Sequence, residues 1–267
     1  MDSIEELRSF LRDAYGILIS REKDYLLTSR LAPVLRQLKL SSLRELWTLI
    51  RQDPKGVAER AFIDAVTTNE TYWFRDTTVF NNLQDKILPE ITERRSQNAL
   101  VRIWSAACST GQEPYSIALC LKKMELAGKS IQSRILGSDI SSDALQRARE
   151  GLYTSFEMDR GLPDSDRQKF FLPEGNMWRI EPAVRSKVTY EQINLMSGRA
   201  DIGQFDIIFC RNVLVYFDED TRTQVINMLA QHVLPGGFLI FGNAERPHAA
   251  FREAFESYAP NIYKKSG

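Results

Sequence analysis

The sequence predicts an α/β fold: a doubly wound parallel sheet that follows a small all-helical N-terminal domain and includes a short β excursion. Residues 100–108 are an apolar run that leads through small polar residues to Gly111. A helical pattern then begins, which completes the order of strand, turn and helix. The same alternation returns in residues 133–150 and in residues 205–243. Parallel strands joined by helices build a sheet of this kind.

Composition places the chain among ordinary globular proteins. It has 267 residues, of which 43% are hydrophobic and 26% charged, and its 35 basic residues balance 35 acidic ones. A balanced charge gives no general attraction to nucleic acid or to an anionic membrane. No apolar run approaches the roughly 18 residues of a membrane span, and charged residues interrupt the N-terminal stretch. We therefore expect a cytoplasmic monomer that neither binds nucleic acid nor inserts into a membrane.

The cysteines and histidines predict neither a disulfide nor a metal site. Cys108, Cys120 and Cys210 are odd in number and show no C-x-x-C spacing, so we expect buried free thiols. His232 lies in a predicted helix and His248 in a loop, and neither has a companion at metal-ligand spacing.

Residues 1–66 are predicted to form the helical domain, because apolar residues recur in them at helical spacing. Ser3 and Ser42 each stand three residues before a glutamate, the capping-box pattern that starts a helix. Pro33 lies inside the second apolar stretch and predicts a kink or a break there. Asp53, followed by proline, predicts the start of the last helix.

One stretch of this domain is purely basic. The charged residues between positions 25 and 44 are Arg30, Arg36, Lys39 and Arg44. Such a stretch is typical of a solvated helix face, and it also suits docking of an acidic helical partner. The pattern alone leaves both interpretations open.

Residues 67–99 are predicted to be a segment that covers a ligand, followed by a connecting helix at about 78–93. The segment 67–76 (TTNETYWFRD) breaks the helical period with polar residues, three aromatic residues and an arginine. A plain linker would be rich in glycine, proline or serine. Aromatic anchoring of a domain junction would explain the rings, but not Asn69, Thr71 and Arg75.

Residues 100–267 are predicted to form the ligand-binding domain. Small side chains around Gly111 would let a ligand approach the backbone and the N-terminus of the following helix. Asp139 closes the second strand, where a carboxylate can accept hydrogen bonds from ribose hydroxyls. The dinucleotide motif G-x-G-x-x-G is absent, because Gly111 is the only glycine in the turn. S-adenosylmethionine, whose site needs no pyrophosphate cradle, is therefore a stronger candidate than a nicotinamide or flavin cofactor.

The second half of the domain contains the β excursion and the remaining strands. The excursion is expected at about 161–190, with short strands near 177–180 and 187–190. The run 187–195 also alternates as a third strand of the main sheet. Further along the chain we expect a fourth strand at 205–212, a helix at 221–232, a turn at 235–237, a fifth strand at 237–243 and an antiparallel edge strand at 261–264. Asn194 and Asn212 would end adjacent strands and face one ligand.

Several segments carry a more specific resemblance. They are 67–75 (TTNETYWFR), 104–118 (WSAACSTGQEPYSIA), 138–141 (SDIS), 193–195 (INL), 205–217 (FDIIFCRNVLVYF) and 235–245 (PGGFLIFGNAE). Together they resemble the chemotaxis receptor glutamate methyltransferases, the CheR family. The segments span nearly the whole chain in the order of that family, which also places a helical module before a Rossmann-like methyltransferase sheet.

The resemblance implies methyl transfer from S-adenosylmethionine to glutamate side chains on the cytoplasmic helices of chemoreceptors, with S-adenosylhomocysteine as the product. It implies that the basic face of residues 25–44 meets the acidic receptor helix. Tyr216 and Arg75 would lie near the reacting groups. The cofactor-binding residues implied are Asn69, Thr71, Arg75, Glu113, Asp139, Asn194, Leu195, Arg211 and Asn212. Gln112 departs from the family, which commonly has an acid at that position.

Each of these residues has a structural alternative. Thr110 and Glu113 form a capping-box pattern, so Glu113 could simply cap its helix. Arg75 could pair with Asp76, and Tyr216 could be a half-buried packing ring. At the level of function, the alternatives are a methyltransferase for another acceptor and a non-catalytic module that binds S-adenosylmethionine. The sequence offers no candidate general base. This fits methyl transfer to glutamate, because a glutamate with a pKa near ~4.3 is already ionised at neutral pH.

Overall fold

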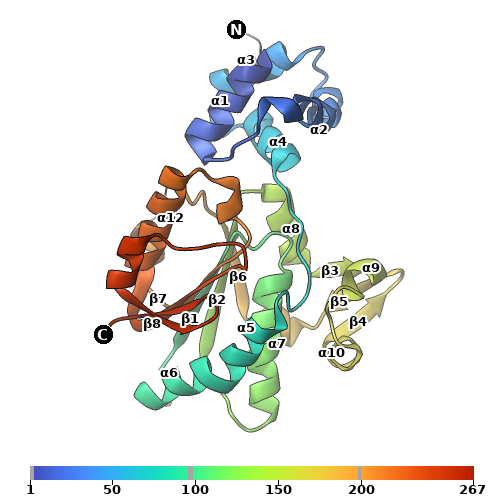
Figure 1. The fold of residues 1–267 in the computed structure, drawn as a ribbon. Helices are drawn as coiled ribbons and strands as arrows, with labels where there is room; N and C mark the ends of the chain where they lie inside the picture. Colours follow the sequence, from blue (N-terminus) through green and yellow to red (C-terminus); the bar gives the residue numbers. More distant parts are fainter. Residues whose placement is uncertain (1–2, 96–98, 198–199) are drawn as a thin grey trace.

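The computed structural model describes residues 3–95, 99–197 and 200–267. The predicted helical domain lies at the top of Figure 1, above the carboxyl ends of the central strands. Four α-helices lie within residues 3–66: α1 (Ser3–Tyr15), α2 (Asp24–Gln37), α3 (Leu43–Gln52) and α4 (Val57–Val66). Their apolar faces meet in one core that includes Leu11, Leu31 and Phe62. The helical period of the sequence was therefore a correct guide to this domain.

Helix α2 continues through Pro33 without a break. Proline cannot donate to the carbonyl of Ser29, but Ser29 is exposed and water can satisfy that carbonyl. Ser42 caps α3 as predicted, by accepting the N–H of Glu45 at 3.3 Å.

The predicted start of the last helix is wrong. Asp53 ends α3, and its carbonyl accepts the N–H of Gly56 at 2.9 Å, which closes a turn. Gly56 is then the N-cap of α4, so the helix begins at Val57. The dipeptide Asp53-Pro54 marks this turn rather than a helix start.

The connecting helix is not uniform. Its parts are α5 (Thr77–Asn82), a π-helical turn labelled η2 (Leu83–Ile87) and α6 (Leu88–Arg94). Pro89 follows the π turn and has no N–H to donate to the carbonyl four residues earlier. The helix was predicted at about these residues, but the change of helical type was not.

A seven-stranded sheet forms the centre of the described chain, in the order β6-β2-β1-β7-β8-β10-β9 (Figure 1). The first five strands of this order are parallel, and β10 pairs antiparallel with both of its neighbours, β8 and β9. The strands are β1 (Val101–Ala106), β2 (Ser133–Asp139), β6 (Val188–Gln192), β7 (Phe205–Cys210), β8 (Val233–Phe241), β9 (Phe255–Ala259) and β10 (Ile262–Lys265). The helices that connect them include α7 (Gln112–Leu126), α8 (Ser142–Glu150) and α12 (Glu219–His232). This order confirms the doubly wound fold class, with β1 and β7 flanking the point where the strand order reverses.

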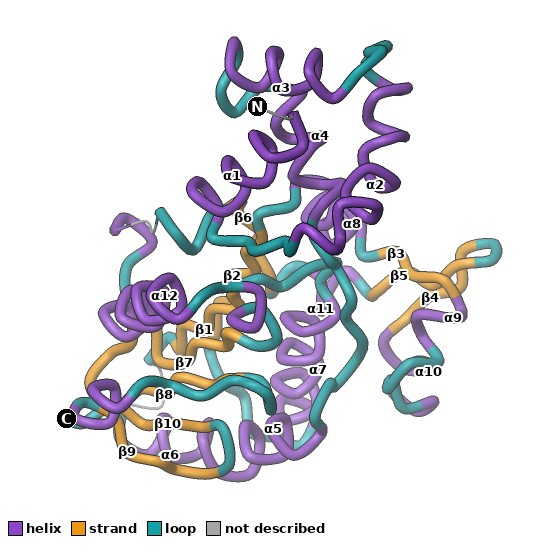
Figure 2. Tube along the Cα trace, turned by 45° about the horizontal axis from the view of Figure 1, so that its top comes forward, coloured by secondary structure: helices purple, strands orange, loops and turns teal. Residues whose placement is uncertain are grey.

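Both faces of this sheet are covered. Ile103 and Trp104 are consecutive in β1 and enter different cores, because side chains alternate across a strand. Ile103 packs in the core shared with α5, α6 and α7, and Trp104 in the core shared with α12. Figure 2 shows α7 and α12 on opposite sides of the strands. Helices on both faces explain why every residue of β7 is buried and why its residues 207–210 are all apolar.

The C-terminal strands differ from the prediction. β10 is antiparallel as expected, but it lies between β8 and β9 and is therefore not an edge strand. The edge is β9 (FESYA), whose half-polar pattern hid it in the sequence. Residues 235–237, predicted as a turn, are part of β8.

The β excursion is a separate three-stranded sheet that projects from the main body in Figure 1. Its strands are β3 (Leu152–Thr154), β4 (Phe171–Glu174) and β5 (Met177–Ile180), and its helices are α9 (Ser155–Met158) and α10 (Asp164–Phe170). The strand predicted near 177–180 is present. The one predicted near 187–190 belongs to β6 of the main sheet, and β3 begins before the expected boundary at 161. Gly151 ends α8 in the left-handed conformation (φ 61°), so β3 follows the helix at once.

Among the described residues, no helix is long and apolar enough to cross a membrane.

Cys108, Cys120 and Cys210 are free and buried, as predicted. Burial raises the pKa of the Cys120 thiol to about 12 and the pKa values of the other two thiols well above their ordinary range.

Candidate active site

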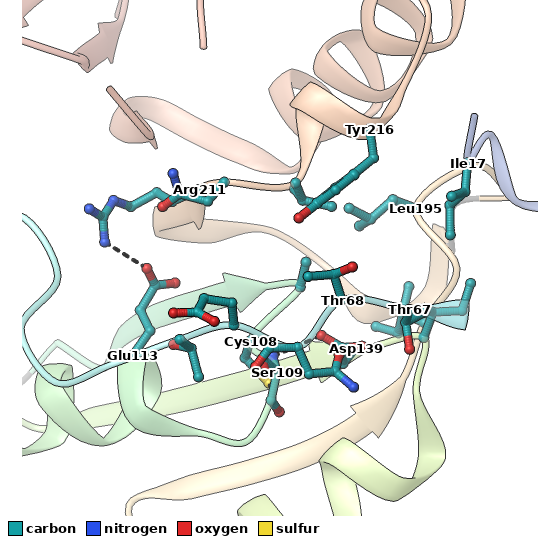
Figure 3. Close-up of a pocket in the computed structure, with 18 of the residues that line it drawn as sticks. Ile17, Thr67, Thr68, Cys108, Ser109, Glu113, Asp139, Leu195, Arg211 and Tyr216 are labelled. Carbon is teal, nitrogen blue, oxygen red and sulfur yellow. Dashed lines mark hydrogen bonds and ion pairs between the residues drawn. The ribbon is translucent and has the colours of Figure 1, made fainter. Parts of the chain in front are cut away.

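A cleft opens at the carboxyl ends of β1, β2, β6 and β7. This is the edge where doubly wound sheets bind ligands. The cofactor-binding and catalytic residues predicted from the sequence all line it. They are Asn69, Thr71, Arg75, Glu113, Asp139, Asn194, Leu195, Arg211, Asn212 and Tyr216. Figure 3 shows several of them converging from different elements.

The floor of the cleft is the turn after β1. Ala107 and Ser109 adopt positive φ angles of 57° and 52°, which are uncommon for residues with a side chain. Gly111 has φ 94°, and a Cβ there would come within 2.9 Å of Ala148 Cβ. Only glycine therefore lets the N-terminus of α7 approach α8 this closely.

Asp139 closes β2 and is almost completely buried at 7% exposure. One carboxylate oxygen accepts the N–H of Ser109 at 2.8 Å, and the other accepts the N–H of Ser141 at 2.9 Å. Burial raises the pKa of Asp139, and these N–H donors oppose that rise. Each oxygen keeps a further lone pair for a hydroxyl donor from the cleft.

Glu113 does not cap its helix. Gly111 is the N-cap of α7, and Thr110 donates to the Gln112 side chain instead. The Glu113 carboxylate accepts from the Ser105 hydroxyl at 2.7 Å and from Arg211 Nη1 at 2.9 Å, the contact drawn in Figure 3. The capping-box alternative is thus wrong for this residue.

Arg211 joins three parts of the site. Its side chain is 1% exposed, and besides Glu113 it binds the carbonyl of Arg75 at 2.7 Å and the carboxylate of Asp76. Asp76 is therefore taken by Arg211, and it also accepts from Asn243 at 2.7 Å. The alternative in which Arg75 pairs with Asp76 is wrong.

The Arg75 guanidinium stays available to the cleft. It makes one long hydrogen bond, of 3.4 Å, to the carbonyl of Glu70 and lies 5.3 Å from the centre of the Tyr72 ring. No carboxylate pairs with it among the residues that the structure describes. An unpaired cation beside a cleft can bind an anionic group of a ligand.

The segment 67–76 lies along one side of the cleft. Trp73 is buried edge-on against Tyr153 and Phe171 of the β excursion, with ring centroids 4.9 and 5.2 Å apart. The hydroxyl of Ser109 donates to the carbonyl of Asn69 at 2.9 Å and fastens the segment to the turn after β1. Buried aromatic anchors therefore hold the segment, and its polar residues line the cleft.

Asn194 and Asn212 both line the cleft, but they do not end adjacent strands. Asn194 follows β6 and Asn212 follows β7, and β2 and β1 lie between these strands. The Asn194 side chain donates to the carbonyl of Ala14 at 2.8 Å and accepts the N–H of Met196 at 3.0 Å. Asn194 thus holds the end of α1 against the sheet edge. Asn212 has φ 62°, and its side-chain amide has no partner within the described chain.

Tyr216 stands at the mouth of the cleft in the 3₁₀ turn Leu214–Tyr216, and 38% of its surface is exposed. Its ring points into the cleft in Figure 3. The Tyr216 carbonyl accepts the N–H of Leu18 at 3.1 Å, which brings the segment after α1 to the cleft. The side chain is therefore half-buried and reachable from solvent.

Comparison with protein families now identifies the chain. Residues 69–262 match the model described as "CheR methyltransferase, SAM binding domain", and residues 2–67 match "CheR methyltransferase, all-alpha domain". This chain belongs to the CheR methyltransferase family. Its cofactor is S-adenosylmethionine, and it has the S-adenosylmethionine-dependent methyltransferase fold.

The similarity of this chain to individual relatives agrees with its membership of the CheR family. It is 40% identical over 245 residues to "Chemotaxis protein methyltransferase Cher2" of Pseudomonas putida, covering 90% of this chain and 89% of the relative. It is 38% identical to "Chemotaxis protein methyltransferase 1" of Pseudomonas aeruginosa over the same shares. It is also 33% identical to "Chemotaxis protein methyltransferase" of Borreliella burgdorferi, over 99% of this chain and 94% of the relative.

The chemistry of the cleft fits this cofactor. S-adenosylmethionine presents a ribose diol, an ammonium, a carboxylate and a sulfonium. The cleft offers the Asp139 carboxylate, the Glu113 carboxylate and the unpaired Arg75 guanidinium, each of the type that complements one of these groups. Ile140, Leu195 and Phe217 add apolar lining for a base.

Sequence reasoning missed Glu245 as a functional support. This carboxylate, 3% exposed, accepts four backbone N–H groups at 2.7–2.9 Å. The donors are Asn212, Val213, Leu214 and Gly242. Glu245 therefore holds the loop that carries Asn212 and leads to Tyr216. An acid after a strand at the ligand edge was the available signal, the same one that led to Asp139.

The four predicted docking residues are all exposed and lie outside the cleft. Arg30 is already engaged, because it donates to the carbonyl of Val66 at 2.6 Å and to Thr68 at 3.3 Å. No ion pair joins Arg36, Lys39 or Arg44 to another described residue. These three cations are the ones that remain available to a partner.

The Glu245 clamp makes a testable prediction. Replacing Glu245 by alanine leaves four N–H groups, two buried and two partly buried, without an acceptor, and we expect a loss of about 3 kcal/mol or more of folding free energy. The melting temperature measured by circular dichroism should fall by about 6 °C or more. Glu256→Ala removes an exposed carboxylate from the edge strand β9 and serves as the control. Equal melting temperatures for the two variants would contradict the role given to Glu245.

Proposed function

We propose that this chain transfers the methyl group of S-adenosylmethionine to glutamate side chains on the cytoplasmic helices of chemoreceptors, forming glutamyl methyl esters. The observation that supports this most is the set of described side chains that line the cleft: several of them can bind and orient a ligand, and these lining residues include no nucleophile–base pair. The relatives named chemotaxis protein methyltransferases support the same acceptor system.

The reaction needs little from the protein beyond binding and alignment. The cofactor supplies an activated methyl group and its leaving group. A glutamate carboxylate is ionised at neutral pH and attacks without a general base. The protein must remove water from that carboxylate and hold it in line with the methyl group, which can contribute ~7–11 kcal/mol to lowering the barrier. Cys108 lines the cleft, but its raised pKa keeps it a thiol and no nucleophile.

Two donors in the cleft can orient the incoming carboxylate. Tyr216 stands at the mouth with a hydroxyl that can donate, and Arg75 is an unpaired cation on the opposite segment. Arg75 also has the charge to hold a carboxylate of the cofactor, so it can act on either ligand. Glu113, Asp139 and the Asn69–Thr71 backbone and side chains then complete the cofactor site.

Docking requires a second surface, because one glutamate side chain offers little binding energy. The helical domain borders the cleft through Tyr15, Ile17 and Val66. Its available cations Arg36, Lys39 and Arg44 suit an acidic receptor helix. The chain would act on this partner as a monomer in the cytoplasm.

Transfer of labelled methyl groups tests the proposed function directly. The purified chain, supplied with S-adenosylmethionine labelled in its methyl group, should label chemoreceptor-containing membranes, and mild alkali should release the label as expected of an ester. Labelling of a small metabolite instead would identify another acceptor. Binding without any labelling would identify a non-catalytic module. Either result would contradict the proposal.

Tyr216→Phe tests the orienting role of the hydroxyl. Loss of one hydrogen bond to a charged group should lower kcat about tenfold. Cofactor affinity, measured by calorimetry, should stay the same because the ring remains. An unchanged kcat would remove the hydroxyl from the mechanism.

Charge reversal tests the docking face. Arg36→Glu combined with Arg44→Glu should raise the Michaelis constant for receptor by about tenfold or more, because two attractive contacts become repulsive. Cofactor affinity should not change, since neither residue lines the cleft. Arg134→Glu changes the same charge at the start of β2, at the end of the sheet away from the cleft, and should leave the Michaelis constant unchanged. An equal effect of both changes would argue against a specific surface.

A further inference from the structure

The loop between β2 and α8 is shared by the cofactor cleft and the helical domain. Asp139 and Ile140 line the cleft, and Ile140 also packs against the core of the helical domain. The next residue, Ser141, is fully buried at 0% exposure. Any shift of the helical domain against this loop would therefore change the position of Asp139.

Asp64 forms the polar part of this contact. It lies in the last turn of α4, and one of its oxygens accepts the Ser141 hydroxyl at 2.8 Å. Its other oxygen accepts the Ser142 hydroxyl at 2.7 Å, and the N–H of Asp143 lies 3.3 Å from the first oxygen. An anionic side chain at this position also complements the positive end of α8.

Two hydrogen bonds then connect Asp64 to the cofactor site. Ser141 donates its hydroxyl to Asp64 and its backbone N–H to Asp139, at 2.9 Å. The Ser141 hydroxyl oxygen also accepts the N–H of Ala144 at 3.1 Å, so its proton has Asp64 as its acceptor. Without Asp64, the buried hydroxyl loses that acceptor and the N-cap of α8 loses its fixed orientation.

We propose that Asp64 is a positioning residue of the methyltransferase, which acts through Ser141 on Asp139 and makes recognition of the cofactor ribose depend on the seating of the helical domain. This inference rests on the proposed function and on the role predicted for Asp139 from its place at the end of β2, which is to accept the ribose hydroxyls. Because coupling is reciprocal, a bound nucleoside also favours the seated arrangement of the helical domain. The affinity of that domain for a docked partner is then linked to the affinity of the cofactor site for its ligand.

The experiment measures binding, so it does not depend on turnover. Calorimetry would compare S-adenosylhomocysteine with its 2′,3′-dideoxy analogue, which lacks both hydroxyls. Asp64→Ala should weaken S-adenosylhomocysteine by about fivefold and the dideoxy analogue by less than about twofold. Asp64→Asn retains one acceptor oxygen and should recover most of the affinity. It also carries the test if the alanine variant does not fold.

Two further variants make the outcome specific. Asp143→Ala removes an exposed carboxylate from the same end of α8 but keeps the Asp64 contacts, and it should bind both ligands as the unaltered chain does. Asp139→Ala should weaken S-adenosylhomocysteine strongly and the dideoxy analogue little. If Asp139→Ala behaves so while Asp64→Ala binds normally, or weakens both ligands equally, the role of Asp64 is overturned and the ribose site stands. If Asp139→Ala leaves S-adenosylhomocysteine binding intact, both assignments fail.

Discussion

The buried guanidinium of Arg211 is the contact on which the site depends. It lies at the end of β7, and it binds Glu113 at the start of α7 as well as Asp76 and the Arg75 carbonyl in the covering segment. Two carboxylates around one guanidinium offset the cost of burying that charge, and removing either one would leave a buried charge partly unpaired. The same contact fixes Glu113 with its Ser105 bond and leaves the neighbouring Arg75 guanidinium free for a ligand. Within the part of the chain that the structure describes, the ion pairs of Arg211 thus leave the Arg75 cation unpaired beside the cleft.

Two buried carboxylates show the same distinction between groups that bond within the protein and groups that face the cleft. Asp139 and Glu245 are both buried acids that follow strands at the carboxyl edge, and both accept backbone N–H groups. Asp139 accepts two N–H groups at 2.8 and 2.9 Å and lines the cleft, so lone pairs remain for a ligand. Glu245 accepts four N–H groups and does not line the cleft, so all of its hydrogen-bonding capacity is used to hold a loop. The two carboxylates therefore differ in how many internal donors they accept, and only Asp139 faces the cleft.

The burial of the strands and the contacts of the cleft residues explain how much could be predicted from the sequence. The central strands were found because helices cover both faces and make runs such as 207–210 wholly apolar, whereas β9 (FESYA) and the three-residue β3 carry no such signal. The residues lining the cleft were predicted through the family resemblance together with the strand-end rule. Sequence order could not show that β1 and β2 separate the strands before Asn194 and Asn212. It also could not show that Glu113, in a capping-box pattern, bonds Ser105 and Arg211, because that depends on the left-handed conformation of Gly111.

The helical domain is part of the site rather than an attachment to it. Ala14 is held by Asn194, Leu18 by the carbonyl of Tyr216, and the β2–α8 loop by Asp64. Each of these contacts ends on a residue that lines the cleft or stands next to one, so the two domains cannot separate without altering the cleft wall. A reaction that needs alignment rather than a reactive side chain benefits from such an arrangement, because its rate depends on how firmly the two reactants are held in line. The hydrogen bonds that join the helical domain to the cleft hold the cleft wall in place on that side.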